Sequence, residues 1–114
     1  MVNINYIIKL NRKFGGALLN KHNLDFDIQM ANRENNIYKS NACIVRGIIA
    51  GHPFSDGNKR TALTVISKRF NKVGIICDEE KLTKGIISIA KKNITNIGNI
   101  SKRLRKWCRK QSIT

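Results

Sequence analysis

A stretch of nine residues, 52–60, carries most of the side chains in this chain that could do chemistry. It reads His-Pro-Phe-Ser-Asp-Gly-Asn-Lys-Arg, so an imidazole, a carboxylate, an amide and two cations surround one glycine. The pKa of free imidazole lies near neutrality, so His52 can take a proton from a hydroxyl nucleophile. Asp56 is a lone carboxylate among cations, which suits Mg²⁺ when phosphate oxygens and water complete the shell. This set predicts chemistry on a nucleotide.

The second half of this stretch is suited to binding phosphate. It lies between the end of one helical pattern and the start of the next, so residues 57–60 should begin a helix. Free backbone N–H groups and the helix dipole bind anions at such a position. Gly57 permits close approach of a phosphate, and Asn58 can donate to a phosphoryl oxygen. Lys59 offers a point charge and Arg60 a planar fork.

Simpler explanations exist for single members of the stretch. Taken alone, His52 could be a hydrogen-bonded histidine at a helix end, and Asp56 could be an N-cap or a salt-bridge partner of Arg60. Phe54 is expected to point into the core and anchor the loop, and Ser55 is expected to be exposed. A Ser55 nucleophile activated by His52 would lack the second acid of a triad.

The flanking sequence predicts an all-α domain that positions this stretch. Residues 39–50 are apolar on several sides, which is typical of a buried, central helix. Two further segments should be extended, 16–23 and 75–77. Together these segments predict a compact bundle of about six helices in one domain, residues 1–114. The helices are expected at residues 3–14, 24–35, 39–50, 60–72, 78–92 and 101–111.

Composition narrows the setting of the protein. Hydrophobic residues make up 41% of the 114 residues, as in globular proteins, and no apolar stretch approaches a membrane span. The three cysteines, Cys43, Cys77 and Cys108, have no short pairing or zinc-type spacing, and an odd count fits free thiols in a reducing compartment. We therefore expect a cytoplasmic protein without a membrane partner.

The net charge of +15 is concentrated in part near the C-terminus. Such a field attracts polyanions such as nucleic acid, nucleotides or an acidic protein. It is equally typical of a solvated helix face. The residues of this basic patch are Lys102, Arg103, Arg105, Lys106, Arg109 and Lys110.

The order of residues in 52–60 resembles the signature of the Fic/Doc (Fido) family, His-x-Phe-x-(Asp/Glu)-Gly-Asn-(Gly/Lys)-Arg. Every fixed position is matched, and we call residues 52–60 the signature segment. The resemblance implies the α-helical Fido fold and transfer of part of ATP, with Mg²⁺, onto a protein hydroxyl. It implies His52 as general base and Asp56 as Mg²⁺ ligand. The phosphate-binding residues that it implies are Gly57, in the anion hole, with Asn58, Lys59 and Arg60.

Two positions distinguish the branches of the family. Fic proteins that transfer AMP usually have glycine in place of Lys59 and a second arginine in place of Leu63. The sequence here is similar to Doc toxins, which are thought to bind ATP reversed and to transfer its γ-phosphate to a threonine of elongation factor Tu. Gly57 departs from Doc, which often has alanine there. We therefore expect a Doc-like toxin kinase acting on a Ser/Thr hydroxyl of a protein such as a translation factor, with AMP transfer as the alternative.

Partners follow from the same resemblance. The family's Ser/Thr-x-x-x-Glu-Gly/Asn inhibitory motif fails at Glu34-Asn35, because Met30 stands where the hydroxyl is needed, so an inhibitor would be a separate antitoxin. The target-docking flap would fall at 16–23. A different class of function is a basic module that binds nucleic acid or a partner through the basic patch. It is not favoured, because Trp107 is the one aromatic residue in that stretch.

Overall fold

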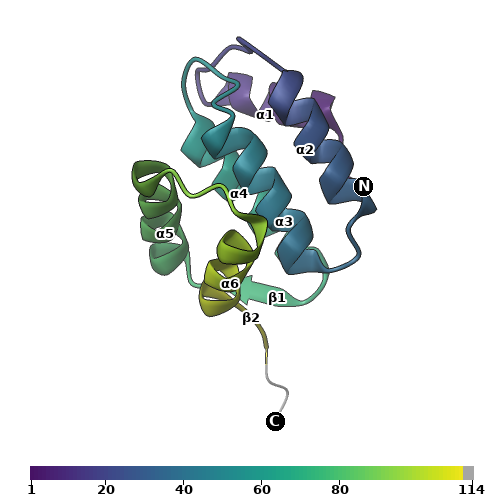
Figure 1. Cartoon of the computed structure of the whole chain (residues 1–114), viewed down its shortest axis with the longest axis vertical. Helices are drawn as coiled ribbons and strands as arrows, with labels where there is room; N and C mark the ends of the chain where they lie inside the picture. Colours follow the sequence, from purple (N-terminus) through teal and green to yellow (C-terminus); the bar gives the residue numbers. More distant parts are fainter. Residues whose placement is uncertain (112–114) are drawn as a thin grey trace.

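The computed structural model describes residues 1–111, which form six α-helices, one π-helical turn and two short strands (Figure 1). The expected all-α Fido-type bundle is confirmed. None of the helices in this described part is long and apolar enough to cross a membrane. In chain order the elements are α1 (Ile4–Lys13), α2 (His22–Arg33), α3 (Ile37–Val45), η1 (Arg46–Ala50), α4 (Asn58–Lys72), β1 (Ile75–Cys77), α5 (Glu79–Lys92), α6 (Ile97–Trp107) and β2 (Cys108–Lys110).

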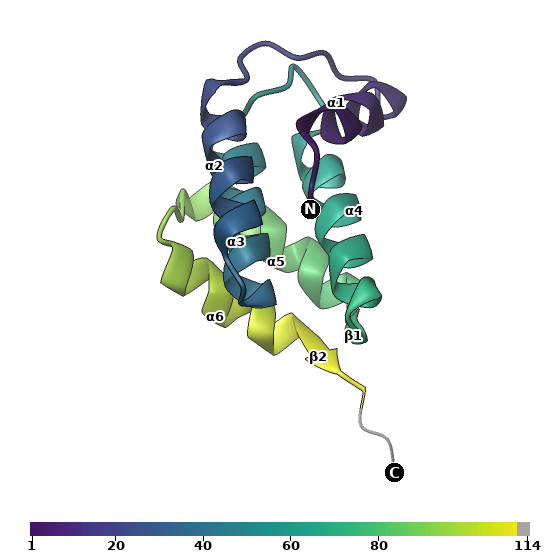
Figure 2. The same ribbon diagram turned by 90° about the vertical axis from the view of Figure 1, so that its right-hand side faces the viewer.

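Helix α3 lies at the centre of the bundle and packs against α2, α4 and α6 (Figures 1 and 2). Every residue from Ser40 to Val45 is buried, which confirms the prediction of a central apolar helix. The helix predicted over 39–50 is α3 followed by η1, and it starts two residues earlier because Asn36 caps it. A charged hydrogen bond of 2.6 Å from Arg46 to Asp27 joins η1 to α2.

The signature segment and the connection between α1 and α2 lie together at one end of the molecule, away from β1 and β2 (Figure 2). Helix α4 starts within the segment, at Asn58, and buries Ala62, Val65, Ile66 and Phe70 in the common core. Because α4 is anchored along its length, its first turn is a rigid base for the residues that precede it.

The bounds of α6 and α2 differ from the predicted ones. Helix α6 starts at Ile97 rather than at 101, because the side chain of Asn96 accepts a hydrogen bond from Asn99 N at 2.9 Å. It also ends at Trp107, and the last residues predicted as helix form β2, antiparallel to β1. Helix α2 starts at His22 rather than at 24, so the expected extended segment is shorter than 16–23.

The expectation of three free thiols is wrong. Cys77 and Cys108 face each other in the register of β1 and β2 and form a disulfide. Only Cys43 is free in the described part, and burial raises the pKa of its thiol. The partners are 31 residues apart, so the pairing exists only once the two strands have met, and no local spacing could have indicated it.

We predict that Gly85→Ala destabilises the protein through the contact between α5 and α6. Gly85 is buried, and a Cβ atom there would overlap the ring of Trp107. Overpacking should lower the free energy of unfolding by about 1–2 kcal/mol, measured by urea denaturation, although alanine favours helix. Thr83→Ala, at an exposed position of the same helix, is the control. A Gly85→Ala variant as stable as the control, or a cost that persists when Trp107 is changed to Leu, would contradict this packing.

Candidate active site

The signature segment is held from outside by the chain between α1 and α2. Leu18 and Phe54 form an antiparallel bridge, flanked by hydrogen bonds from Leu19 N to Pro53 O (2.8 Å) and from Ser55 N to Ala17 O (2.9 Å). Ser55 is exposed, as expected, and its Oγ accepts from Ala17 N at 3.0 Å. Residues 17–19 of the expected flap are therefore paired with the signature segment along one edge.

Phe54 and Asn58 hold the segment from within. Phe54 is fully buried, which confirms its expected place as the anchor. Asn58 is 7% exposed, and its Oδ1 accepts from Phe54 N at 3.2 Å while its Nδ2 donates to Phe54 O at 2.9 Å. Nδ2 also lies 3.3 Å from Nδ1 of His52. Both amide hydrogens are thus used inside the loop, so direct donation from Asn58 to phosphate stays a prediction that requires one contact to open.

His52 is the exposed member of the segment that could act as a base. Its backbone has φ 45°, in the left-handed region that few side chains other than glycine adopt. A backbone of this kind is often found where function requires a side chain to be presented. The contact with Asn58 orients the ring, and the Nε2 atom makes no hydrogen bond within the described residues.

The carboxylate of Asp56 is exposed and accepts a hydrogen bond from Gly57 N at 2.7 Å. The two simpler roles considered for it are not observed. The N-cap of α4 is Gly57, and no ion pair joins Asp56 to Arg60 within residues 1–111. No group of three or more His, Cys, Asp or Glu residues in this part could hold a metal. An exposed carboxylate of this kind is chemically suited to Mg²⁺ beside phosphate oxygens and water, and the role of Asp56 as that ligand stays a prediction.

The first turn of α4 carries the backbone donors that the predicted phosphate site requires. The earliest bond into this turn runs from Thr61 N to Gly57 O, so the N–H groups of residues 58–60 have no backbone partner in the described chain. Lys59 and Arg60 are exposed, and the guanidinium of Arg60 lies 4.7 Å from the centre of the Phe14 ring. Gly57 has φ 74°, a conformation suited to glycine, and a Cβ atom there would lie 3.2 Å from Asn11 Nδ2 and from Phe14 Cβ.

Asn11 is a site residue that the sequence analysis missed. It is completely buried in α1, and its Nδ2 donates to Asp56 O (2.8 Å) and to Thr61 Oγ1 (3.1 Å). It thereby joins α1 both to the signature segment and to α4. A signal was present, because Ile4, Ile7 and Asn11 are spaced as one helix face, and a polar residue on an apolar face needs a polar partner.

The basic patch is not part of this site. Its residues belong to α6 and β2, at the end of the molecule away from the signature segment (Figures 1 and 2). Arg105 lies 4.5 Å from the centre of the Tyr38 ring, and Arg103 Nε donates to Asn99 Oδ1 at 2.9 Å. The two groups of cations are therefore separate surfaces.

We predict that Asn11→Ala lowers the free energy of unfolding by about 2 kcal/mol, because Asp56 O and Thr61 Oγ1 lose their donor in a buried place. Asn5→Ala, at an exposed asparagine of the same helix, should change it by less than about 0.5 kcal/mol. Urea denaturation of both variants tests this. Equal stability of the two variants would show that the Asn11 bridge does not hold the segment.

Comparison with known proteins matches a family over the part of the chain that contains the signature segment. The model of the Fic/DOC family matches residues 5–68, which is more than half of the chain and runs from α1 through the signature segment into α4. A search of curated proteins and a search of solved structures found no significant match. Members of the matched family are in general protein-modifying transferases. The chain belongs to the Fic/DOC family.

Proposed function

We propose that this protein is a Doc-type toxin kinase, which transfers the γ-phosphate of ATP to a serine or threonine hydroxyl of another protein. The family typically uses ATP with Mg²⁺. The choice within the family depends on the first turns of α4. Lys59 is exposed beside the anion site, and Leu63 follows one turn later, where AMP-transferring members usually have glycine and arginine.

The chemistry assigns one step to His52. The substrate hydroxyl gives its proton to the imidazole while its oxygen attacks the γ-phosphorus. The bond between the γ-phosphorus and the bridging oxygen breaks, and ADP leaves with that electron pair. A phosphorylated protein and ADP result, and the proton on His52 passes to solvent. The exposure of His52 permits both the approach of the hydroxyl and this last transfer.

The ring must change one contact to do this. Because Asn58 Nδ2 is a donor toward Phe54 O, it also faces Nδ1 of His52 as a donor, and the neutral ring then carries its hydrogen on Nε2. For Nε2 to accept a proton, the hydrogen must first move to Nδ1 and the contact with Asn58 must open. That contact is 3.3 Å long, so little is lost when it opens.

The remaining residues of the segment bind and orient. When Mg²⁺ is bound it neutralises phosphate charge, and Asp56 is the residue that would hold it. The N–H groups of residues 58–60 and the side chains of Lys59 and Arg60 bind phosphate oxygens. Lys59 adds bulk and charge where the α-phosphate of an AMP donor would lie. This favours the reversed ATP, with the γ-phosphate at the hydroxyl.

The extended chain at Leu18 is the proposed docking edge for the target protein. Its hydrogen-bonded edge faces the signature segment, through Leu19 N and Ala17 O. The N–H and C=O of Leu18 form no hydrogen bond within the described residues. A strand of the substrate can pair there, as in β-strand addition, which would bring its hydroxyl beside His52.

AMP transfer is the alternative reaction. Gly57 favours it, because Doc often has alanine there. Inhibition by a separate antitoxin is proposed because Met30, exposed on α2, replaces the hydroxyl residue of the inhibitory motif. A translation factor as target implies the cytoplasm. Binding of nucleic acid through the basic patch is the proposal of a different class, and it replaces the catalytic proposal if no transfer is found.

We predict that His52→Ala lowers phosphate transfer at least about 100-fold, because it removes the general base. The assay incubates purified protein with Mg²⁺, cell extract and either α- or γ-labelled ATP. The expected result is γ-label alone on a protein band. His22→Ala, which removes the other histidine of the chain, at an exposed position of α2, should keep full activity. Full activity of His52→Ala would refute the base, and α-label would refute the kinase.

We also predict that the double variant Lys59→Gly/Leu63→Arg moves labelling from the γ- to the α-phosphate. The glycine frees the α-phosphate site, and the new arginine holds the outer phosphates as in AMP-transferring members. Lys59→Arg keeps charge and bulk and should still transfer γ-label. A double variant that transfers only γ-label would show that other residues set the orientation of ATP.

A further inference from the structure

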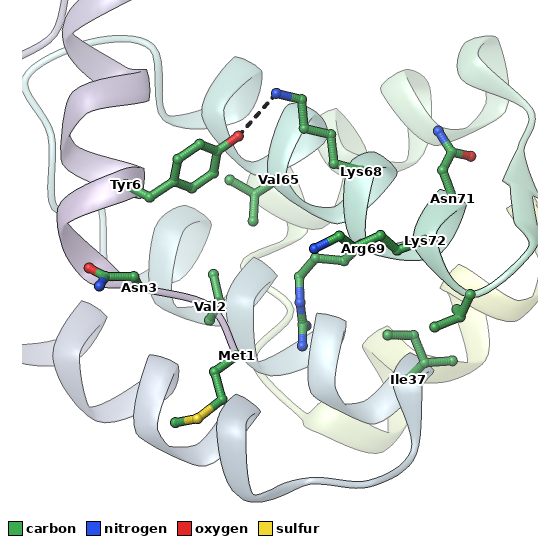
Figure 3. Close-up of a pocket in the computed structure, with 11 residues that line it drawn as sticks. Met1, Val2, Asn3, Tyr6, Ile37, Val65, Lys68, Arg69, Asn71 and Lys72 are labelled. Atoms are coloured by element: carbon green, nitrogen blue, oxygen red, sulfur yellow. Dashed lines mark hydrogen bonds between the residues drawn. The ribbon is translucent and has the colours of Figure 1, made fainter.

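A cavity of about 770 Å³ lies between the N-terminal residues, α1 and the C-terminal half of α4 (Figure 3). Val2, Tyr6, Val65 and Val73 contribute to its largely apolar walls. No residue of the signature segment lines it. Lys68 follows Arg60 by eight residues of α4, which is roughly 12 Å along the helix axis. The cavity is therefore separate from the candidate active site.

Arg69 places a charge in this cavity without a counter-ion. The side chain is half-buried, and its Nη1 donates to two neutral oxygens, Ser40 Oγ at 3.0 Å and Asn41 Oδ1 at 2.6 Å. No carboxylate forms an ion pair with it within residues 1–111. Burial lowers the pKa of Arg69, which reflects the cost of taking a cation out of water. The two anchors fix the guanidinium, and its Nε and Nη2 make no hydrogen bond in the described part.

Two lysines add to the positive charge. Lys68 and Lys72 also line the cavity, and none of its lining residues is acidic. Figure 3 shows Lys68 reaching toward Tyr6, whose hydroxyl it meets at 3.1 Å. Glu79 lines a smaller neighbouring hollow that Lys68 shares, but the two form no ion pair in the described residues. Lys68, Arg69 and Lys72 thus give the lining of the cavity three cationic side chains.

We propose that this cationic cavity binds a small organic carboxylate with an apolar body, such as an acyl chain. The planar carboxylate suits the fork of Arg69, and Lys68 and Lys72 add positive charge to the lining of the same cavity. The body would cover Val65, Val73 and Tyr6. A volume of about 770 Å³ is within the range of small-molecule sites, which combine apolar walls with a few fixed polar groups. This inference does not depend on the proposed phosphate transfer.

The test compares two ligands that differ in the head group: decanoate, used below its micelle concentration, and decanol, used below its solubility limit. Binding to the full chain is measured by calorimetry and by the shifts of backbone amide signals in NMR spectra. We expect decanoate to bind at least tenfold more tightly than decanol. The shifted signals should include Tyr6, Val65 and Val73. Equal affinities, no binding, or shifts confined to other surfaces would overturn the proposal.

Charge variants locate the head group. Arg69→Met keeps length and apolar character and should weaken decanoate at least tenfold with little effect on decanol. Lys72→Met should weaken the binding of decanoate severalfold. If Arg69→Met fails to fold, the affinity of Lys72→Met for decanoate tests the proposal instead. Lys91→Met, at an exposed position of α5, is the matched control and should bind as the unmodified protein does. Decanoate affinity that falls equally in the control, or that survives both cavity variants, would refute the site.

An acidic peptide is the competing occupant. A peptide of alternating Leu and Glu with amidated ends tests it in the same two measurements. If this peptide bound the cavity more tightly than decanoate, the surface would be a protein-docking site and the proposal of a small carboxylate would be wrong.

Discussion

The candidate active site depends on two asparagine amides that hold a short, irregular loop in one shape. The side chain of Asn58 forms hydrogen bonds with the backbone N–H and C=O of Phe54 inside the loop. The side chain of Asn11, in α1, donates both to the backbone carbonyl of Asp56 in the loop and to Thr61 of α4. A loop lacks the regular backbone hydrogen bonds of a helix or sheet, so its buried polar groups need side-chain partners. Without both amides, His52 and Asp56 would lie on a mobile segment. Their effect is that exposed chemical groups are carried by a rigid, buried support.

The rest of the bundle serves the same purpose. Helix α4 is packed along its length, so its first-turn N–H groups face a fixed point in space. Close packing around the loop also explains Gly16, where a Cβ atom would overlap Asn11 and the Asp56 carbonyl. The basic patch and the cationic cavity lie on surfaces other than that of the candidate active site.

The sequence predicted the local features and missed those that need distant residues. The buried helix over 39–50 and the loop anchor Phe54 were predicted, because apolar pattern and turn residues are local signals. Strand β2 and the Cys77–Cys108 disulfide were missed, because each depends on a partner more than 30 residues away in the chain. For Asn11 the apolar helix face was a local signal, but its partner Asp56 is 45 residues away. The disulfide also counts against the expected cytoplasmic location, since the reducing conditions there favour free thiols. The proposed roles of His52, Asp56, Lys59 and Arg60 rest on the family motif and on the exposure of these side chains.

The mass that the protein adds to its target tests the central claim most directly. The target band from a cell extract treated with the protein, ATP and Mg²⁺ would be isolated and compared with the band from a His52→Ala reaction. The account predicts the added mass of one phosphoryl group on a serine or threonine, and none with the variant. The added mass of AMP, or an unmodified target in both reactions, would contradict it.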